Sequence, residues 1–282
     1  MILKNIQKIR IFLLVYFFCF VFVSAQELAA SSRKSGKSQV SCKSVVLSDT
    51  VNVKRLYGKN IHKKVLPAST AKVMTALLVL EKLSLNQYLT VHPGAVGVQP
   101  SKINVRSGER YKVRDLLYAI LIQSANDASI VLAEAAAGSE ENFVELMNKR
   151  AKELGALHTR FANSNGLPTP KIKQYTTAYD MYLIFRQALK YEFFRDAIKY
   201  KYKIIYSTMG RKIPLKNHNK ILFTDWKKRI YGKTGYTKSA KACFVGTLQN
   251  GEKTLIISVF GCSDERWDDI KYIVSRYGGV DL

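Results

Sequence analysis

A serine and a lysine three residues apart, Ser69 and Lys72, stand at the start of a long apolar run. Pro67 suits the entry to a helix, and residues 73–80 are almost wholly apolar, which predicts a buried helix. Positions i and i+3 share a helix face, so the hydroxyl and the amine can meet. The helix N-terminus and burial both oppose a charge on the lysine, and a neutral amine beside a hydroxyl makes a nucleophile with its base. A serine here can also act only as a helix cap, but a cap leaves Lys72 unexplained.

Two further motifs carry polar groups that acyl transfer needs. Ser124-Ala125-Asn126 ends a segment of helical spacing, and Lys233-Thr234-Gly235 lies in a β-rich run. Acyl transfer requires a nucleophile, a base, a proton shuttle and donors for the oxyanion. A substrate that ends in a carboxylate also needs a cation, which Lys233 supplies. The plainer alternatives are that the Ser124 motif only caps helices and that Lys233 is a solvated strand residue.

The elements that must position these motifs are β-rich segments near both ends of the chain and helical segments in its middle. Residues 44–48 and 53–57 favour a β-hairpin, and residues 114–190 have helical spacing. Four β-rich pieces and a final helix follow, with Asn250-Gly251 as a hairpin signal. The order predicts an α+β fold, in which N- and C-terminal segments build one antiparallel sheet beside a helical lobe.

The N-terminus has the pattern of an export signal. A basic segment with Lys4, Lys8 and Arg10 precedes an apolar run over residues 11–23, and small residues follow at 24–25. The apolar run has 13 residues, fewer than the ~20 that span a bilayer, which favours cleavage over a permanent anchor. We therefore predict a signal peptide over residues 1–25, a flexible linker over 26–40 and one catalytic domain over 41–282. The protein should act in the periplasm, or at the outer face of the cytoplasmic membrane or cell wall.

The chain is strongly basic, with 45 Lys+Arg against 21 Asp+Glu and a net charge of +24. Such charge suits polyanions, but an exported protein rarely meets nucleic acid, so nucleic acid is not an expected partner. An anionic wall polymer or membrane surface is the better candidate. A general preference for lysine in the proteome explains the charge equally well.

Three cysteines, Cys42, Cys243 and Cys262, remain after removal of the predicted signal. An odd number without close spacing fits neither a disulfide scaffold nor a zinc site. We expect isolated thiols and no metal.

The order and context of the three motifs resemble the serine β-lactamases and penicillin-binding proteins, and most closely the low-molecular-mass D-alanyl-D-alanine carboxypeptidases. The resemblance extends from about residue 45 to the end of the chain. It is carried by residues 44–50, 57–60, 67–81, 107–110, 113–127, 161–167 and 232–237. The resemblance implies a β-lactamase/transpeptidase-like fold with flanking helices and a helical subdomain.

By this resemblance, Ser69 is the acylated nucleophile and Lys72 takes its proton. Ser124 relays the proton towards the leaving D-alanine amine, helped by Lys233. Asn126 binds the peptide backbone of the substrate and steadies Lys72.

The resemblance assigns the rest of the substrate site to the strand motif. Lys233 and Thr234 receive the terminal carboxylate. The backbone N–H groups of Ser69 and Tyr236 form the oxyanion hole, and Gly235 lets the substrate approach the strand closely.

The implied activity is that of a serine-type D-Ala-D-Ala carboxypeptidase, which trims peptidoglycan stem peptides through an acyl-enzyme and is acylated by β-lactam antibiotics. No cofactor is implied. A DD-endopeptidase, a β-lactamase and a catalytically silent wall-binding or penicillin-sensing protein are the alternatives. Residues 161–167 are carboxypeptidase-like, and no acidic residue fits the water-activating step of fast β-lactamases.

Two departures from the family pattern, at Lys241 and after Gly235, affect these expectations, and His218 lies in a polar stretch that fits the pattern. Lys241 stands where the family usually has glycine, which predicts strain if the position requires a positive φ. His218 precedes the Lys233 strand and is expected at the surface. Only 47 residues follow Gly235, so we expect no second C-terminal domain.

Overall fold

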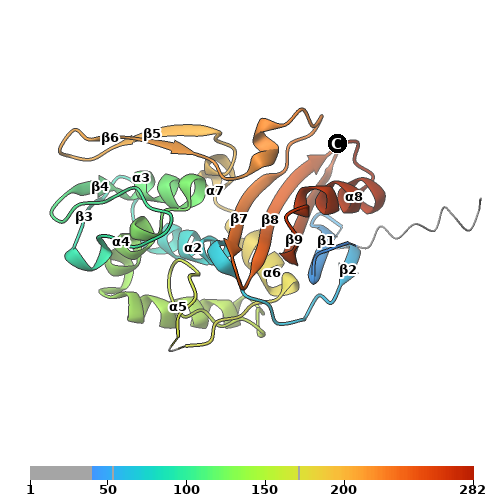
Figure 1. Cartoon of the computed structure of the whole chain (residues 1–282), viewed down its shortest axis with the longest axis horizontal. Helices are drawn as coiled ribbons and strands as arrows, with labels where there is room; N and C mark the ends of the chain where they lie inside the picture. The colour runs from blue at the N-terminus through green and yellow to red at the C-terminus, as the bar shows by residue number, and fades with distance from the viewer. Residues whose placement is uncertain (1–39, 53, 171) are drawn as a thin grey trace, which may run out of the picture. The chain divides into compact units, whose positions relative to one another are not determined.

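Five antiparallel strands form the main sheet, in the order β2–β1–β9–β8–β7 (Figure 1). The strands are β1 (Ser44–Asp49), β2 (Lys54–Lys59), β7 (Tyr231–Thr237), β8 (Lys241–Asn250) and β9 (Lys253–Cys262). The first two come from the N-terminal part of the domain and the other three from the C-terminal part. This topology confirms the predicted α+β fold with a sheet built from both ends of the chain.

The computed structural model describes residues 40–282 except 53 and 171. Residues 41–282 form one compact unit. The predicted signal peptide and all but the last residue of the predicted linker lie outside the described residues. Within the described part of the chain, no helix is both long enough and apolar enough to cross a membrane.

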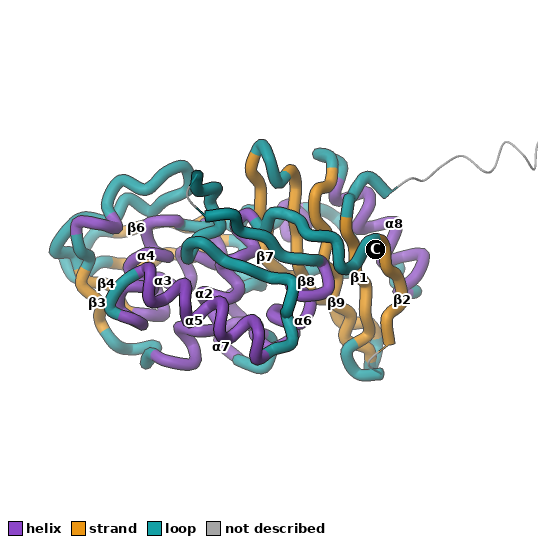
Figure 2. The backbone as a smooth tube through the Cα atoms, turned by 90° about the horizontal axis from the view of Figure 1, so that it is seen from below, coloured by secondary structure: helices purple, strands orange, loops and turns teal. Residues whose placement is uncertain are grey.

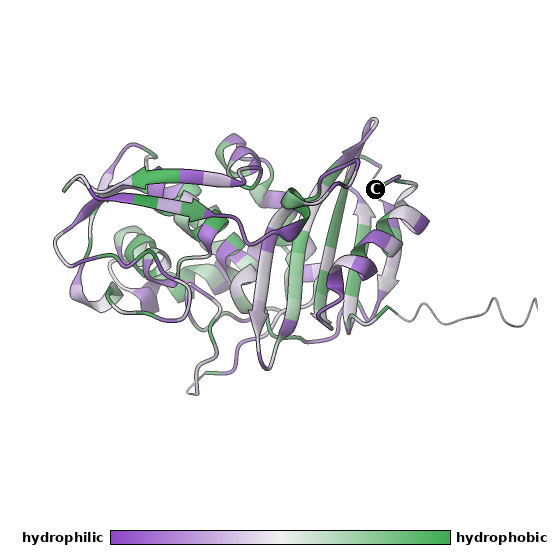
Figure 3. Cartoon of the chain, turned by 45° about the horizontal axis from the view of Figure 1, so that its top comes forward, coloured by the Kyte–Doolittle hydropathy of each residue, from purple (hydrophilic) through white to green (hydrophobic). Residues whose placement is uncertain are grey.

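Burial follows the residue types of the strands. All six residues of β1 are buried, as are the last eight of β9, while the edge strand β2 exposes lysine and arginine. Figure 3 shows the central strands as largely hydrophobic. Because α6 (Ala178–Ala188) and α8 (Arg266–Gly278) both contact β1 and β9, the sheet is covered on its two faces. The tube in Figure 2 shows most of the helices beside the sheet.

The helical lobe contains most of the remaining elements. Its helices are α2 (Lys72–Lys82), α3 (Val113–Tyr118), α4 (Asn126–Ala137), α5 (Glu140–Glu153) and α7 (Glu192–Ala197). Ser139 caps α5 by accepting the N–H of Asn142 at 3.1 Å, and Thr177 caps α6 by accepting the N–H of Asp180 at 3.0 Å. Two small hairpins complete the lobe: β3 (Tyr88–Thr90) with β4 (Arg110–Lys112), and β5 (Tyr202–Tyr206) with β6 (Lys212–Lys216).

The expectation of three isolated thiols is wrong for two of them, because Cys42 and Cys262 form a disulfide. The register of β1 on β9 explains the pairing. Ser44 lies opposite Phe260, so two residues further along each strand Cys42 meets Cys262. Cysteine spacing alone could not show this, since 220 residues separate the pair. Cys243 is a buried free thiol, as expected, and burial raises its pKa to about 11.

Candidate active site

Ser69 lies in a tight turn that leads directly into a buried helix. Residues Ala68–Ala71 form a 3-10 turn and Lys72 is the first residue of α2, so the predicted single helix starts with a tighter turn. Ala68 adopts a left-handed φ of 46°, an uncommon conformation for alanine. The turn preserves the predicted spacing, since Lys72 Nζ lies 3.0 Å from Ser69 Oγ.

The Lys72 amine is fully buried and surrounded by acceptors. Its Nζ lies 2.7 Å from Asn126 Oδ1 and 2.8 Å from the carbonyl oxygen of Asn165. Burial, and then the charge of Lys233, lower the pKa of Lys72 well below its ordinary value. A neutral amine has two N–H groups and one lone pair. If the two carbonyl oxygens take the N–H groups, the lone pair is left for the Ser69 hydroxyl, which is the geometry of a general base.

The Asn165 carbonyl reaches Lys72 because its loop packs tightly under the Ser69 turn. Thr75 Oγ1 donates to the carbonyl of Ser164 at 2.5 Å, and Glu140 accepts the Ser164 N–H at 2.9 Å. Gly166 has φ 82°, and a Cβ there would lie 1.8 Å from the Ala68 carbonyl oxygen. Only glycine fits this contact, which explains the residue type within the carboxypeptidase-like stretch.

Ser124 and Lys233 form a second serine–lysine pair. Ser124 follows a π-helical turn over Ala119–Gln123 and adopts a left-handed φ of 61°. Its Oγ accepts a hydrogen bond from Lys233 Nζ at 2.9 Å, and this Nζ also donates to the Thr234 carbonyl at 3.0 Å. Burial, and then the nearby Arg266, lower the pKa of Lys233 to about 7. Ser124 is therefore held by a lysine that titrates near neutrality.

The strand motif lies against the Ser69 turn. A Cβ at Gly235 would lie 3.1 Å from the Ser69 nitrogen and 3.1 Å from Ala68 Cβ. Gly235 thus allows the Ser69 turn to approach β7. This is a second reason for glycine here, in addition to the close approach of the substrate that the resemblance implies. Because β7 is an edge strand of the sheet, its outer side is available for an extended peptide. Thr234 is buried, and the Tyr236 side chain is exposed.

Arg266 is a residue of this region that the sequence reasoning missed. It is half-buried, and its guanidinium donates to the carbonyls of Gly235 at 3.2 Å and Cys243 at 3.3 Å. It therefore holds β7 and β8 together behind the motif and contributes a positive charge near Lys233. The sequence predicts only a final helix here, and the fold is needed to show that Arg266 lies behind the Lys233 motif.

Asn126 is fixed from a loop on the other side of the site. Its backbone N–H donates to the Ser101 carbonyl at 2.7 Å, and its Nδ2 donates to the Gln99 carbonyl at 3.0 Å. The adjacent Asp127 is buried and accepts the backbone N–H groups of Ile103 and Val105. Residues 99–105 are thus tied to the start of α4, which orients the Asn126 amide towards Lys72.

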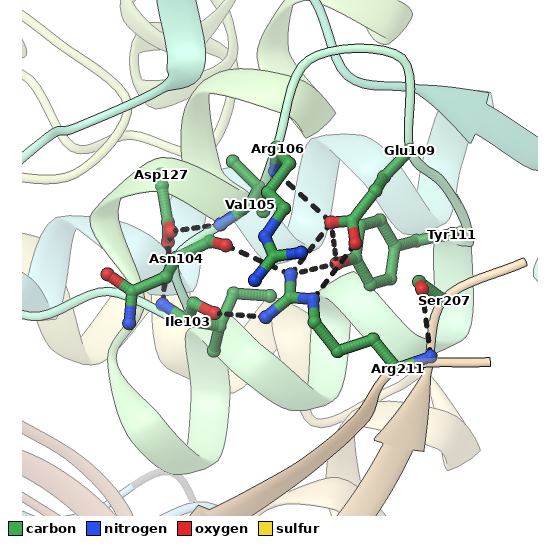
Figure 4. Close-up of polar contacts among 9 residues, drawn as sticks. All are labelled: Ile103, Asn104, Val105, Arg106, Glu109, Tyr111, Asp127, Ser207 and Arg211. Atoms are coloured by element: carbon green, nitrogen blue, oxygen red, sulfur yellow. Dashed lines mark hydrogen bonds and ion pairs between the residues drawn. The ribbon is translucent and has the colours of Figure 1, made fainter. Parts of the chain in front are cut away.

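An ion pair between buried Glu109 and half-buried Arg211 also holds this loop (Figure 4). Arg211 lies between β5 and β6, and its guanidinium contacts Glu109 at 2.9 and 2.7 Å. Glu109 also accepts from the Tyr111 hydroxyl at 2.6 Å, and Arg211 donates to the Ile103 carbonyl at 3.2 Å. The hydrogen bonds from Arg211, together with that from Tyr111, lower the pKa of Glu109 to about 2. Figure 4 shows the two carboxylates on either side of residues 103–106, where Asp127 accepts from Ile103 and Val105 and Glu109 accepts from the Arg106 N–H.

Five of the predicted site residues form two contact groups, one of three residues and one of two, and the other predicted residues lie along β7. Lys72 joins Ser69 to Asn126, and Lys233 contacts Ser124. Two expectations outside this group also agree with the structure: His218 is exposed, and Lys241 has the strained left-handed φ of 60°.

The sheet, the helical lobe and the two serine–lysine pairs define the fold class of penicillin-binding proteins and DD-transpeptidases. A D-alanyl-D-alanine carboxypeptidase of Mycobacterium tuberculosis H37Rv aligns with a TM-score of 0.79 and 27% identity, over 87% of this chain and 94% of that one. The Streptomyces K15 DD-transpeptidase aligns with a TM-score of 0.79 and 25% identity, over 86% of this chain and 99% of that one.

The chain belongs to the D-alanyl-D-alanine carboxypeptidase family, which it matches over residues 29–264. It is 36% identical to the D-alanyl-D-alanine carboxypeptidase DacF of Bacillus subtilis over 227 residues, 78% of this chain and 57% of that protein. It is 33% identical to DacB2 of Mycobacterium tuberculosis over 193 residues, 68% of this chain and 65% of that protein. The chain thus spans about three fifths of the length of these relatives.

Proposed function

We propose that this protein is a serine D-Ala-D-Ala carboxypeptidase that removes the terminal D-alanine from peptidoglycan stem peptides. The observation that carries the proposal is the buried Lys72 amine, held against Ser69 by two carbonyl acceptors beside the Ser124–Lys233 pair. Family membership supports the same reaction. The substrate is an extended peptide along β7, with its terminal carboxylate at protonated Lys233 and Thr234.

The reaction begins when the Ser69 oxygen attacks the carbonyl carbon of the D-Ala-D-Ala bond and its proton passes to Lys72. The negative charge on the carbonyl oxygen is stabilised by the backbone N–H groups of Ser69 and Tyr236. The C–N bond then breaks as the proton reaches the leaving nitrogen through Ser124. D-Alanine departs and an ester on Ser69 remains. Lys72 is neutral again and takes a proton from water, whose oxygen attacks the ester carbon. The bond from that carbon to Ser69 Oγ then breaks as Lys72 gives the proton to Oγ, which releases the shortened peptide and restores Ser69 and neutral Lys72.

The same chemistry predicts that penicillins acylate Ser69 and that the resulting acyl-enzyme is hydrolysed slowly. Two carboxylates next to the site, Asp127 and Glu140, are already occupied by backbone N–H groups. They are therefore poorly placed to activate water for fast release of the antibiotic. This occupancy favours a drug target over a β-lactamase.

We also propose that the protein is exported by residues 1–25 and works in the periplasm or at the outer face of the cytoplasmic membrane or cell wall. The signal pattern supports export, and the Cys42–Cys262 disulfide is typical of oxidising compartments. An anionic wall polymer or membrane surface as a partner agrees with the net charge of +24.

The experiment compares three substrates with the pure protein: a peptide ending in D-Ala-D-Ala, a cross-linked peptide dimer and a penicillin. We expect release of D-alanine, and a penicillin adduct that turns over slowly. Preferred cleavage of the dimer would make the protein an endopeptidase, and rapid penicillin turnover would make it a β-lactamase. A lasting adduct without peptide cleavage would indicate a penicillin-sensing protein.

A further inference from the structure

The outer face of the β5–β6 hairpin combines exposed apolar side chains with lysines. The strand register places Tyr202 opposite Lys216, Ile204 opposite Pro214, and Tyr206 opposite Lys212. We call these six residues the hairpin face. All six are exposed, with Tyr202 at 60%, Ile204 at 43% and Tyr206 at 55%. The alternate residues Ile205, Ile213 and Leu215 are buried, so the hairpin presents one face to the core and the other to solvent.

Further apolar groups adjoin the hairpin face. Met209, in the turn between β5 and β6, is 68% exposed. Phe223 is 39% exposed and packs edge-on against Tyr202, with ring centroids 5.5 Å apart. The amines of Lys201 and Lys216 lie 5.9 and 5.7 Å from the Phe223 ring centre. The surface is thus apolar and aromatic in its middle, with cations beside it.

All charged side chains of the segment that contains the hairpin are positively charged. Residues 197–224 contain seven lysines or arginines and no aspartate or glutamate. Arg211 is turned inwards to Glu109, and Lys203 lies 4.8 Å from the Tyr118 ring centre. Lys199 is exposed but pairs with Asp196. The other exposed lysines of the segment surround the apolar residues: Lys201, Lys212, Lys216 and Lys220.

We propose that the hairpin face docks onto an anionic lipid bilayer. Tyrosine is favoured at the level of the lipid headgroups, and lysines beside it attract anionic lipids. A soluble polyanion would be bound by the lysines alone and would leave Ile204, Met209 and Phe223 in water. The bilayer takes both kinds of side chain, which is why the apolar residues favour it. This inference rests on the proposed export of the protein.

Docking would place the active site close to the membrane, because the hairpin is bonded to the Ser124 turn. Lys216 N–H donates to Gln123 Oε1 at 3.0 Å, and His218 N–H donates to the Ile122 carbonyl at 3.3 Å. Figure 1 shows the hairpin over α3, apart from the five-stranded sheet. The enzyme would then act on stem peptides near the outer surface of the bilayer.

The test is co-sedimentation of the exported protein with vesicles of phosphatidylcholine, with and without phosphatidylglycerol. One variant removes apolar contacts by Ile204→Ser with Tyr206→Ser, and a second removes charge by Lys212→Gln with Lys216→Gln. All four side chains point to solvent, so both variants should fold. Penicillin labelling of Ser69 in the same samples reports the fold and the proposed function separately from vesicle binding.

A matched control changes the same kinds of residue elsewhere on the surface, by Leu157→Ser with Lys149→Gln and Lys152→Gln. Leu157 is 69% exposed, and both lysines are exposed.

We expect binding that requires phosphatidylglycerol and that the control variant retains. Each lysine near an anionic surface contributes about a fivefold change in affinity, so the charge variant should bind about 25-fold more weakly. The apolar variant should lose about tenfold through the lost burial of its side chains. Wild-type binding by both hairpin variants would overturn the proposal. The proposal would also be overturned if only the charge variant lost affinity and the wild type bound soluble polyphosphate as well as it binds vesicles. That result would indicate that the hairpin face binds an anionic polymer.

Discussion

The pair of buried Glu109 and half-buried Arg211 offers a quantitative test of how the loop beside Asn126 is held. Substitution Glu109→Gln keeps the shape of the side chain and removes its charge. The Glu109 side chain is 1% exposed and its pKa is lowered from 4.5 to about 2, mainly by the hydrogen bonds from Arg211. This lowering of the Glu109 pKa corresponds to about 3 kcal/mol of stability at neutral pH.

The sign of the pH dependence follows from the lowered pKa. A carboxylate whose pKa is depressed in the folded state stabilises it above the unfolded pKa of about 4.5. That contribution is lost as the pH falls towards 2. The difference in unfolding free energy between wild type and Glu109→Gln should therefore be about 3 kcal/mol at pH 7 and should shrink below pH 4.5.

Urea unfolding at several pH values measures this difference. The Glu81–Arg150 ion pair provides a matched control, because the Glu81 side chain is 20% exposed whereas that of Glu109 is 1% exposed. Glu81→Gln should cost about 1 kcal/mol or less, as is usual for surface pairs. A loss below 1 kcal/mol in Glu109→Gln at pH 7, or a loss that does not change with pH, would refute the reasoning. Penicillin acylation should also slow in Glu109→Gln, since the loop fixes Asn126.

Three further predictions concern the site and the disulfide. The KM for a peptide with a free terminal carboxylate should rise as the pH increases through about 7, because Lys233 loses its charge there. The KM for the same peptide with an amidated end should not follow this pH profile. Gly235→Ala should slow penicillin acylation by about tenfold or more without unfolding the protein, because the new Cβ would press on the Ser69 nitrogen and small misplacements of a nucleophile are costly. Cys42→Ser should lower the unfolding free energy by about 5 kcal/mol, the chain-entropy value for a loop of this length. A reductant should destabilise the wild type equally and leave the variant unchanged, and a smaller effect in calorimetry would contradict this estimate.

Local rules on the sequence were sufficient for the core of the site. The i, i+3 spacing of Ser69 and Lys72 survives even though the turn is 3-10 rather than α-helical, because both conformations keep these positions on one side. The β-rich segments at both ends of the chain were also enough to predict one antiparallel sheet built from N- and C-terminal strands.

The contacts that hold the site come from distant parts of the chain and could not be predicted in this way. The Asn165 carbonyl is 93 residues from Lys72, and Arg211 is 102 residues from Glu109. The Cys42–Cys262 bond depends on the pairing of β1 with β9, which spacing does not reveal. The sequence shows Gly166 only as part of the carboxypeptidase-like stretch 161–167, and does not show that the Ala68 carbonyl lies against it.

The central claim is that Ser69 forms the acyl-enzyme and that neutral Lys72 takes its proton. Rapid-quench mass spectrometry during turnover of a D-Ala-D-Ala peptide tests it most directly. We predict an acyl adduct on the peptide fragment that contains Ser69, formed faster as the pH rises through the lowered pKa of Lys72, and absent in Ser69→Ala. Turnover without an adduct on Ser69, or an adduct that forms at the normal rate in Lys72→Ala, would contradict the account.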